Sequence, residues 1–386
     1  MLSPKEKRQI TYGLQLLTKE MELQIIKILA EEIVRGGITE TGKLLIAEAQ
    51  KSGLLYNRII KSIAAYLKKS KKEIKKAFKT AKVEQAKYDS DMYGMKVALS
   101  PEMAELFKTE YIRSCKEFKN FTKTTARAYL KAYHNACDKA YTLTMSNMTT
   151  WQEAVRQAVN EIGAGVKIEY ASGYKTTPEV AVARSLRTSI AQTCSEVTAQ
   201  RAAENGVTLF LTSAHDGARP SHVPWQGKVF WVDWEKLKAV MPSISVPNPA
   251  PQASKEDKAK YSEFVESTHI GEIDGLEGIN CRHSYGPFFS TAKNPYEHRT
   301  YDNAKYYKEQ TARKYEREIR SLKYKHRALK ASLAAATDPT LKEKLQADFD
   351  KTDKRLTEKV KEYYTYCNSN EIKVPQEMRL FINEKG

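Results

Sequence analysis

Two apolar segments flank a polar loop in residues 207–232, which run VTLFLTSAHDGARPSHVPWQGKVFWV. The segments 207–211 and 228–232 are rich in Val, Leu, Phe and Trp, and this composition predicts two buried strands. The Thr-Pro-Glu triplet at 177–179 predicts a helix start, and the Asn-Gly pair at 205–206 predicts the left-handed end of that helix. A helix that turns tightly into a strand, with a second strand after a loop, indicates an α+β core.

Helical periodicity marks the chain on both sides of this core. Ser100-Pro101 predicts an N-cap with proline in the first turn, and Asp338-Pro339 interrupts two polar helical stretches that together predict a helical hairpin. Apolar residues recur at helical spacing within 12–34, 55–67 and 103–145. We therefore expect an α+β fold with three parts: a basic helical N-terminal region at 1–150, a small mixed α/β core at 151–295, and a C-terminal helical hairpin and tail at 296–386.

The chain carries 64 Lys and Arg against 47 Asp and Glu, a formal net charge of +17. Residues 1–100 contribute +9, residues 101–300 contribute +2, and residues 301–386 contribute +6. Such a surplus favours a polyanionic or acidic partner, with nucleic acid as the first candidate. The near-neutral middle separates any chemistry there from an electrostatic role at the ends.

The densest basic cluster lies in 68–87, where nine lysines are opposed only by Glu73 and Glu84. Helical spacing would place six of these lysines on one face. A solvated helix face and a phosphate-binding stripe both fit this pattern. The possible nucleic-acid contacts are Lys68, Lys72, Lys75, Lys76, Lys79 and Lys82.

Several classes of protein are disfavoured by composition. No stretch has the roughly 18 uncharged apolar residues of a membrane span, and the first ten residues are too charged for a signal peptide. The five cysteines are odd in number and form no CxxC pair, so we expect a reducing compartment and no disulfide framework.

Two polar motifs contain the densest chemistry: SAHDGARPSHVPWQGKVF at 213–230 and GINCRHSYGPF at 278–288. These motifs resemble the phage minor capsid protein 2 family, which is related to the MuF-like head morphogenesis proteins. The basic segment YEREIRSLK at 315–323 also resembles the C-terminal helix of that family. The resemblance is specific within about 165–330 and weaker in the N-terminal helices.

The resemblance implies a MuF-like core and a non-enzymatic virion component for head assembly. It places such a protein at the portal vertex, on the inner side of the capsid, and in the host cytoplasm during assembly. The implied partners are the phage portal protein and the major capsid or scaffold proteins. The basic helices add packaged DNA as an expected partner.

The two motifs allow three interpretations. As a structural signature, their side chains would fix two loops across a small sheet, with Trp225 packed beneath. As a metal site, three histidines and one cysteine would supply the ligands that zinc accepts, although the spacing matches no common zinc motif; otherwise no cofactor is expected. As a zinc-dependent nuclease or toxin-like effector, the histidines would serve as bases, but no two-metal carboxylate cluster accompanies them. A free-standing host DNA-binding protein is disfavoured because no recognition helix is evident.

The residues of these hypotheses overlap, and no catalytic residue is assigned. The possible metal ligands are His215, His222, Cys281 and His283. The structural signature comprises His215, Asp216, Arg219, His222, Trp225, Gly227, Asn280, Cys281, Arg282 and His283.

Overall fold

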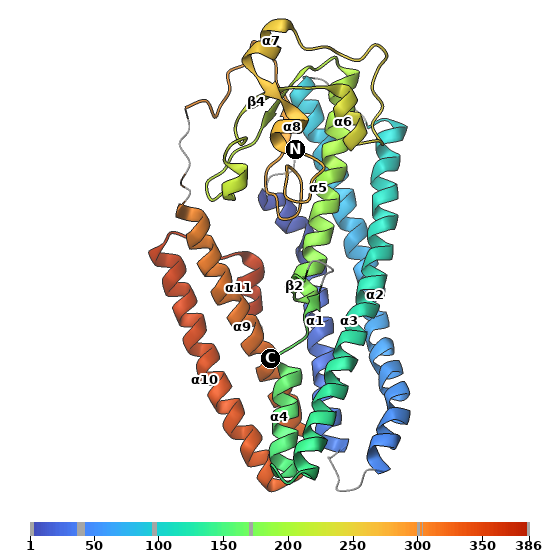
Figure 1. Ribbon diagram of the computed structural model, residues 1–386, viewed down its shortest axis with the longest axis vertical. Helices are drawn as coiled ribbons and strands as arrows, with labels where there is room; N and C mark the ends of the chain where they lie inside the picture. The colour runs from blue at the N-terminus through green and yellow to red at the C-terminus, as the bar shows by residue number, and fades with distance from the viewer. Residues whose placement is uncertain are drawn as a thin grey trace. The chain divides into compact units, whose positions relative to one another are not determined.

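The computed structural model describes residues 4–36, 43–94, 99–169, 173–298, 302 and 304–383. Long helices dominate these residues, and the strands among them are short (Figure 1). In chain order the elements are α1 (Pro4–Gly36), α2 (Lys43–Tyr93), α3 (Pro101–Met145), α4 (Trp151–Gly163), β1 (Ile168–Glu169), β2 (Lys175–Thr176), α5 (Pro178–Glu204), β3 (Leu209–Thr212), the 3-10 helix η1 (Pro220–His222), β4 (Val229–Trp231), α6 (Trp234–Val240), α7 (Lys255–Lys260), β5 (Ser262–Glu263), α8 (Phe264–Thr268), β6 (Tyr285–Pro287), α9 (Ala304–Ala335), α10 (Pro339–Ser369) and α11 (Gln376–Asn383).

Local capping explains where several helices begin and end. The Ser100 hydroxyl accepts a hydrogen bond from the Met103 amide at the start of α3, at 3.3 Å. Asp338 does the same for α10, and Gly206, with a φ of +68°, lets the chain leave α5. These contacts confirm the predicted ends of three helices, and the α+β class with helical terminal regions is confirmed as well. No described helix is both long and apolar enough to cross a membrane.

The chain folds into two compact units, each assembled from segments that are distant in sequence. The predicted division into 1–150, 151–295 and 296–386 follows the order of the chain instead, and it stays a prediction. Unit 1 comprises Met1–Gly13, Lys71–Glu117 and Ala183–Tyr307, and unit 2 comprises Leu14–Ser70, Phe118–Val182 and Lys308–Gly386.

Unit 1 contains a four-stranded sheet in the order β5-β4-β3-β6. Strands β3 and β4 are antiparallel neighbours, which confirms both predicted strands, and β6 pairs with the other edge of β3. Phe210 of β3 packs in a T-shaped arrangement on Trp234 and Phe264, with ring centroids 5.8 and 5.1 Å away. The C-terminal part of α5 covers this face of the sheet through Ala199, Ala202 and Ala203.

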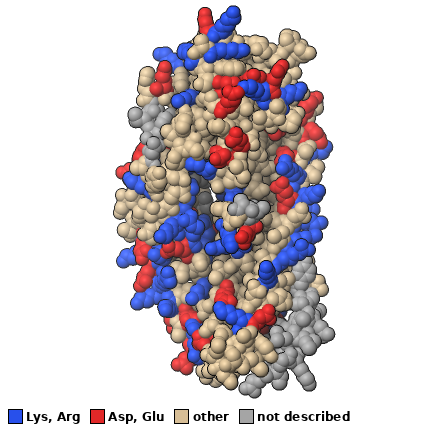
Figure 2. Space-filling view, in the orientation of Figure 1, with Lys and Arg blue, Asp and Glu red and all other residues tan. Residues whose placement is uncertain are grey.

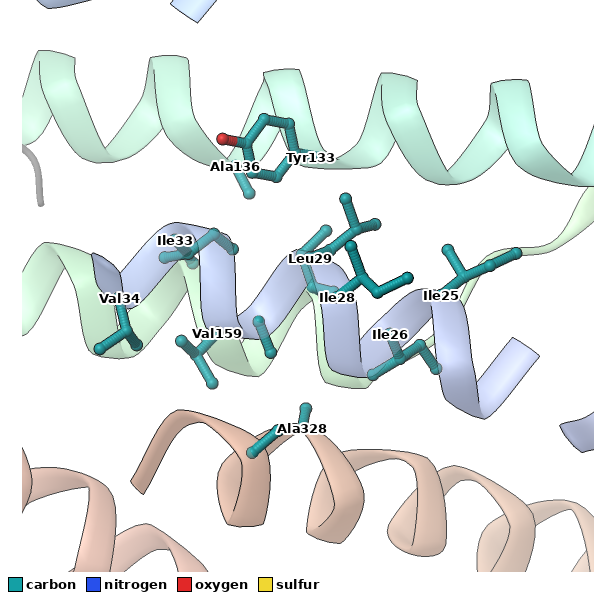
Figure 3. Packing of buried hydrophobic residues seen from close by; sticks show 14 of the residues in the cluster. Ile25, Ile26, Ile28, Leu29, Ile33, Val34, Tyr133, Ala136, Val159 and Ala328 are labelled. Atoms are coloured by element: carbon teal, nitrogen blue, oxygen red, sulfur yellow. The ribbon is translucent and has the colours of Figure 1, made fainter. Parts of the chain in front are cut away.

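Unit 2 is a helical bundle around an apolar cluster (Figure 3). Residues of α1 are buried at consecutive as well as helical spacings, so this part of α1 is enclosed on several sides. Ile25 and Leu29 are fully buried, and full burial of such a side chain contributes about 1.5–3 kcal/mol. In Figure 3 the cluster also includes side chains of α3, α4 and α9: Tyr133, Ala136, Val159 and Ala328.

Helices α9 and α10 form an antiparallel hairpin within unit 2, which confirms the predicted hairpin (Figure 1). The Tyr363 hydroxyl of α10 donates a hydrogen bond to Glu316 of α9 at 2.9 Å. Helix α11 packs on the same pair through Met378 and Phe381, which share an apolar cluster with Ile319. The hairpin is therefore stabilised by its own core.

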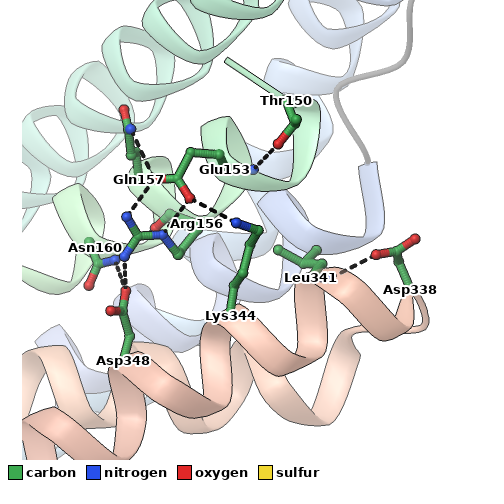
Figure 4. A network of polar contacts seen from close by, with 9 residues as sticks. All are labelled: Thr150, Glu153, Arg156, Gln157, Asn160, Asp338, Leu341, Lys344 and Asp348. Atoms are coloured by element: carbon green, nitrogen blue, oxygen red, sulfur yellow. Dashed lines mark hydrogen bonds and ion pairs between the residues drawn. The ribbon is translucent and has the colours of Figure 1, made fainter.

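Charged side chains join α4 to α10 in unit 2 (Figure 4). Arg156 of α4 donates to Asp348 of α10 at 2.7 Å, and Lys344 lies 3.5 Å from Glu153. Hydrogen bonds from Arg156 lower the pKa of Glu153 to about 2. The Asp338 cap of Leu341 lies in the same region. These contacts align α4 and α10 beside the apolar cluster to which both helices contribute.

A second polar network is buried in unit 2. Tyr129 donates to Glu22 at 3.0 Å, and the Tyr324 hydroxyl lies 3.1 Å from Glu22 and 3.0 Å from Glu179. Glu22 and Glu179 are 0% and 2% exposed. The Nε atom of Arg320 contacts Glu179 at 2.8 Å, so one of the two carboxylates has a charged partner.

Burial, together with the charge of Glu179, raises the pKa of Glu22 to about 8. The hydroxyl of Tyr324 has one proton and lies between two carboxyl groups, so it can donate to only one of them. With Glu22 protonated, Glu22 donates to Tyr324, and Tyr324 donates to Glu179. Glu179 lies in the first turn of α5 beside Arg320, where a negative charge is favoured. Glu22 therefore carries the proton near neutral pH.

Candidate functional site

The candidate site is formed by two loops of unit 1, residues 213–228 between β3 and β4 and residues 277–284 before β6. They meet because β6 pairs with β3, which aligns Thr212 with Tyr285. Just beyond that pair, the Ser213 amide donates to the Ser284 carbonyl at 2.7 Å, and the Ser284 amide donates to the Ser213 hydroxyl at 2.9 Å. The sheet register therefore brings together two motifs that are about 60 residues apart in sequence.

Two arginines connect these loops reciprocally. Arg219 of the first loop donates to the Ile279 carbonyl at 3.2 Å, and Arg282 of the second donates to the Gly217 carbonyl at 2.7 Å. Gly217 and Asn280 have φ values of +70° and +60°, which turn the backbone at both contacts. Hydrogen bonds from a charged donor are the stronger kind, so each loop holds the other in place.

Four aromatic rings fill the space between the loops. Trp225 lies beneath them, with centroid distances of 4.7 Å to His222 and 4.8 Å to His283. His215 stacks on His283 at 4.3 Å with an interplanar angle of 21°. His222 and His283 are 2% and 1% exposed, so both imidazoles are held inside the protein.

Hydrogen bonds fix the tautomers of the two buried histidines. Nε2 of His222 faces the Asp274 carbonyl at 2.9 Å, and a carbonyl oxygen only accepts, so this nitrogen carries a proton. Nε2 of His283 faces Oε1 of Gln226 at 3.1 Å, and the His215 amide donates to that same oxygen. Gln226 therefore presents an acceptor, and Nε2 of His283 also carries a proton. Burial lowers the pKa of His222, which favours a neutral ring.

These tautomers leave the Nδ1 lone pairs of both histidines pointing into the cluster. The two Nδ1 atoms are 3.3 Å apart. Sγ of Cys281 lies 3.9 Å from Nδ1 of His222 and 3.7 Å from Nδ1 of His283. All three donor atoms lie within 4.8 Å of one another. Three of the four predicted metal ligands thus converge and could hold a metal ion.

The other signature residues have backbone or packing roles. Nδ1 of His215 lies 2.9 Å from the Asp216 carbonyl, and His215 lies outside the group of three donor atoms. Gly227 has a φ of +69°, and its carbonyl accepts from Asn294 at 2.9 Å. The Trp225 carbonyl accepts from the Thr212 hydroxyl at 2.7 Å.

Sequence reasoning missed the two groups that orient the rings, Gln226 and the backbone carbonyl of Asp274. Gln226 carried a signal, since a glutamine between Trp225 and Gly227 offers an amide directly beside the buried rings. The Asp274 carbonyl could not be identified from the sequence, because every residue type has a backbone carbonyl.

The lysine-rich surface is on α2. Lys72, Lys75, Lys76 and Lys79 are exposed, and Lys68 precedes them on the same helix and is exposed as well. Lys82 is half-buried. The opposite side of the helix is apolar, with Ile74, Ala77, Phe78 and Ala81 all buried.

Glu73 is the acidic residue nearest these lysines in sequence, and it does not lie on their face of the helix. Its carboxylate approaches Gly13 of α1 so closely that a Cβ at that glycine would clash with it. No ion pair joins Lys72, Lys75, Lys76 or Lys79 to an acidic group of the described residues. Over much of the face seen in Figure 2, basic and acidic side chains are interspersed.

Comparison with known families identifies the class of protein. Residues 2–361 match the family described as phage minor capsid protein 2, and that range includes both loop motifs and most of the helical regions. The chain therefore belongs to the phage minor capsid protein 2 family, whose members are structural proteins of the bacteriophage virion. Neither the curated proteins nor the solved structures gave a significant match.

Proposed function

We propose that this protein is a non-enzymatic component of the phage head that associates with the portal vertex on the inner side of the capsid and acts in head assembly. The observation that carries the proposal is the family match over residues 2–361. The partners are the portal protein and the major capsid or scaffold proteins, and assembly takes place in the host cytoplasm.

The geometry of the two loops supports a structural role. Arg219 and Arg282 each donate to a backbone carbonyl of the opposite loop, and two hydrogen bonds join Ser213 to Ser284. Such interlocking contacts hold a surface in one shape, which is what a protein that docks in a fixed assembly requires. MuF-like architecture for this unit stays part of the proposal.

Association with the portal is tested by co-sedimentation. The purified protein is mixed with portal rings or procapsids of its own phage, and the pelleted fraction is measured. We expect the protein to pellet with the portal and to remain soluble without it. Absence of association under every assembly condition tested would contradict the portal assignment.

We further propose that the exposed lysines of α2 contact the packaged genome and contribute to head assembly or genome ejection. Four exposed lysines on one helix face, none of which forms an ion pair with the described residues, make the kind of positive stripe that binds phosphates. Binding of this kind is independent of sequence and weakens steeply with salt, because it releases counterions from DNA.

A charge-reversal experiment tests the DNA contact. The variant has Lys72, Lys75, Lys76 and Lys79 changed to Glu, and DNA affinity is measured across a range of salt concentrations. If all four lysines contact phosphates, the slope of log affinity against log salt falls by about 3 to 4.

The matched control reverses four exposed lysines of α10, a helix on which acidic residues alternate with basic ones: Lys342, Lys351, Lys354 and Lys361. Each reversal removes two positive charges, so both variants fall from +17 to the same +9. Equal losses of affinity in the two variants would show that only net charge matters and would contradict a site on α2.

One observation favours the alternative of a zinc-dependent nuclease or toxin-like effector: the convergence of His222, Cys281 and His283. A DNA-cleavage assay with added zinc, comparing the natural chain with His222→Ala, separates the two functions. We expect no cleavage by either chain. Cleavage that His222→Ala abolishes would establish the enzymatic alternative.

A further inference from the structure

We propose that the donor atoms of His222, Cys281 and His283 bind one zinc ion. A tetrahedral zinc ion with bonds of about 2.0 Å to nitrogen and about 2.3 Å to sulfur holds two nitrogens about 3.3 Å apart and a nitrogen and a sulfur about 3.5 Å apart. The corresponding distances in this protein are 3.3 Å between the nitrogens and 3.7 and 3.9 Å to the sulfur. The triangle already has the size of one face of a zinc tetrahedron.

The arrangement of protons supports a cation at this position. Both Nε2 atoms donate to oxygen acceptors, one to the Asp274 carbonyl and the other to Gln226. The two Nδ1 atoms face each other at 3.3 Å, and they are the ring nitrogens that those two hydrogen bonds leave to a cation. A zinc ion between them would bind both nitrogens at once.

The surroundings of the triangle match those of known metal sites. A histidine that ligates a metal usually donates its other ring nitrogen to a carbonyl or carboxylate, which fixes the tautomer and the ring orientation. His222 and His283 both do so through Asp274 and Gln226. The Cys281 sulfur takes part in no disulfide, and zinc binds cysteine through this atom.

Three protein ligands leave the fourth position of the tetrahedron to water. His215 is not assigned to it, because its ring stacks on His283 and its ring nitrogens lie outside the group of three donor atoms. Cys281 is half-buried while both histidines are buried, so the water reaches the ion from the side of the cysteine.

The ion would add a direct link between the two loops. His222 belongs to the loop that follows β3, whereas Cys281 and His283 belong to the loop that precedes β6. Arg219 and Arg282 already connect the same loops through hydrogen bonds. A structural zinc ion of this kind stabilises the folded protein whether or not the chain has a catalytic activity.

Metal binding is tested first on the wild-type chain, so the result does not depend on whether a variant folds. The chain is purified without chelator, its metal content is measured, and the metal-free form is titrated with Co²⁺. We expect one zinc ion per chain and, with Co²⁺, the absorption band of a cobalt–thiolate bond. Zinc should also raise the melting temperature of the metal-free chain. Absence of stoichiometric metal, of the cobalt–thiolate band and of the thermal shift would overturn the proposal.

Single substitutions test which side chains bind the metal ion. Cys281→Ser should abolish the cobalt–thiolate band, and His222→Ala and His283→Ala should reduce metal affinity at least tenfold. Cys115→Ser removes a cysteine elsewhere in unit 1 and should bind metal as the wild type does. His215→Ala should retain one ion per chain. Loss of metal in His215→Ala, or a cobalt–thiolate band that survives in Cys281→Ser, would overturn the three-ligand assignment.

Discussion

Each compact unit buries a polar cluster, and the two clusters are built from different chemistry. In unit 1 the cluster between the loops consists of aromatic rings, an amide and backbone carbonyls, with His222 and His283 held by Asp274 and Gln226. In unit 2 the network is made of carboxyl groups, tyrosines and a guanidinium, with Glu22 protonated and Glu179 paired to Arg320.

The difference determines how each cluster responds to its surroundings. The stability that neutral groups and backbone carbonyls contribute depends on hydrogen-bond geometry. The stability that a buried carboxylate contributes depends on its cationic partner and on pH. The stability of unit 2 should therefore depend on charge, and that of the loops in unit 1 on the hydrogen bonds that orient their rings.

The largest effect is expected from Arg320→Met in unit 2. Glu179 would lose its cation while it remains 2% exposed, and an uncompensated buried charge costs about 3 kcal/mol or more. The Arg320 side chain is 15% exposed, so water can replace only part of the lost contact. Urea denaturation followed by hydrogen exchange in α9 measures the loss. Arg317→Met, at an exposed position of the same helix, is the control, and an equal loss there would contradict a role for the ion pair.

In unit 1 we expect Gln226→Ala to cost about 2 kcal/mol. The substitution removes the acceptor for Nε2 of His283 and for the His215 amide, and it leaves both donors buried without that partner. Hydrogen exchange at the amides of 213–228 and 277–284 measures the loss. The control is Gln252→Ala, at an exposed position of unit 1, where a change within about 0.5 kcal/mol is expected. Unchanged exchange in both loops would show that Gln226 does not hold them.

The stability of unit 2 should depend on pH through Glu22. The pKa of Glu22 is about 8 in the folded chain, and its ordinary value is 4.5. Between these values the folded state holds a proton that the unfolded state has lost. The stabilisation is therefore complete below pH 4.5 and is lost as pH rises through 8, by about 1 kcal/mol per pH unit. Tyr129, Tyr324 and Glu179 face Glu22, and Arg320 pairs with Glu179.

The variant Glu22→Gln isolates this contribution, because glutamine imitates the protonated carboxyl group. We expect the difference in unfolding free energy between Glu22→Gln and the wild type to grow in favour of the variant between pH 5 and pH 8. A difference that does not change with pH would show that Glu22 keeps the same charge in both states.

The smallest effect is expected from Asp348→Ala, in the α4–α10 network of Figure 4. Arg156 and Asp348 are 28% and 16% exposed, and Arg156 keeps Glu153 as a second partner. We expect a loss of about 1 kcal/mol in urea denaturation, since partly exposed ion pairs contribute little. A loss as large as that of Arg320→Met would mean that burial does not decide which charges stabilise unit 2.

Much of the fold follows from local sequence signals. Periodicity and caps at Ser100, Asp338 and Gly206 marked the ends of helices, and apolar composition marked β3 and β4. Strands β5 and β6 were not predicted, because two or three residues are too few to show an alternating pattern. The two discontinuous units were not predicted either, since long-range packing leaves no signal in any one segment.

The candidate site was predictable in its chemistry and less so in its geometry. The ligand types of His222, Cys281 and His283 were visible in the sequence, but their convergence depends on the pairing of β6 with β3. The buried network of unit 2 was missed altogether. A carboxylate at Glu22, between apolar residues Met21 and Leu23, was the signal that could have revealed it.

We propose that this member of the family is a structural protein at the inner side of the portal vertex. Cryo-electron microscopy of virions with and without the protein tests it most directly. We expect the difference map to contain density inside the capsid at the portal vertex. Density spread evenly over the shell, or confined to the outer surface, would contradict it.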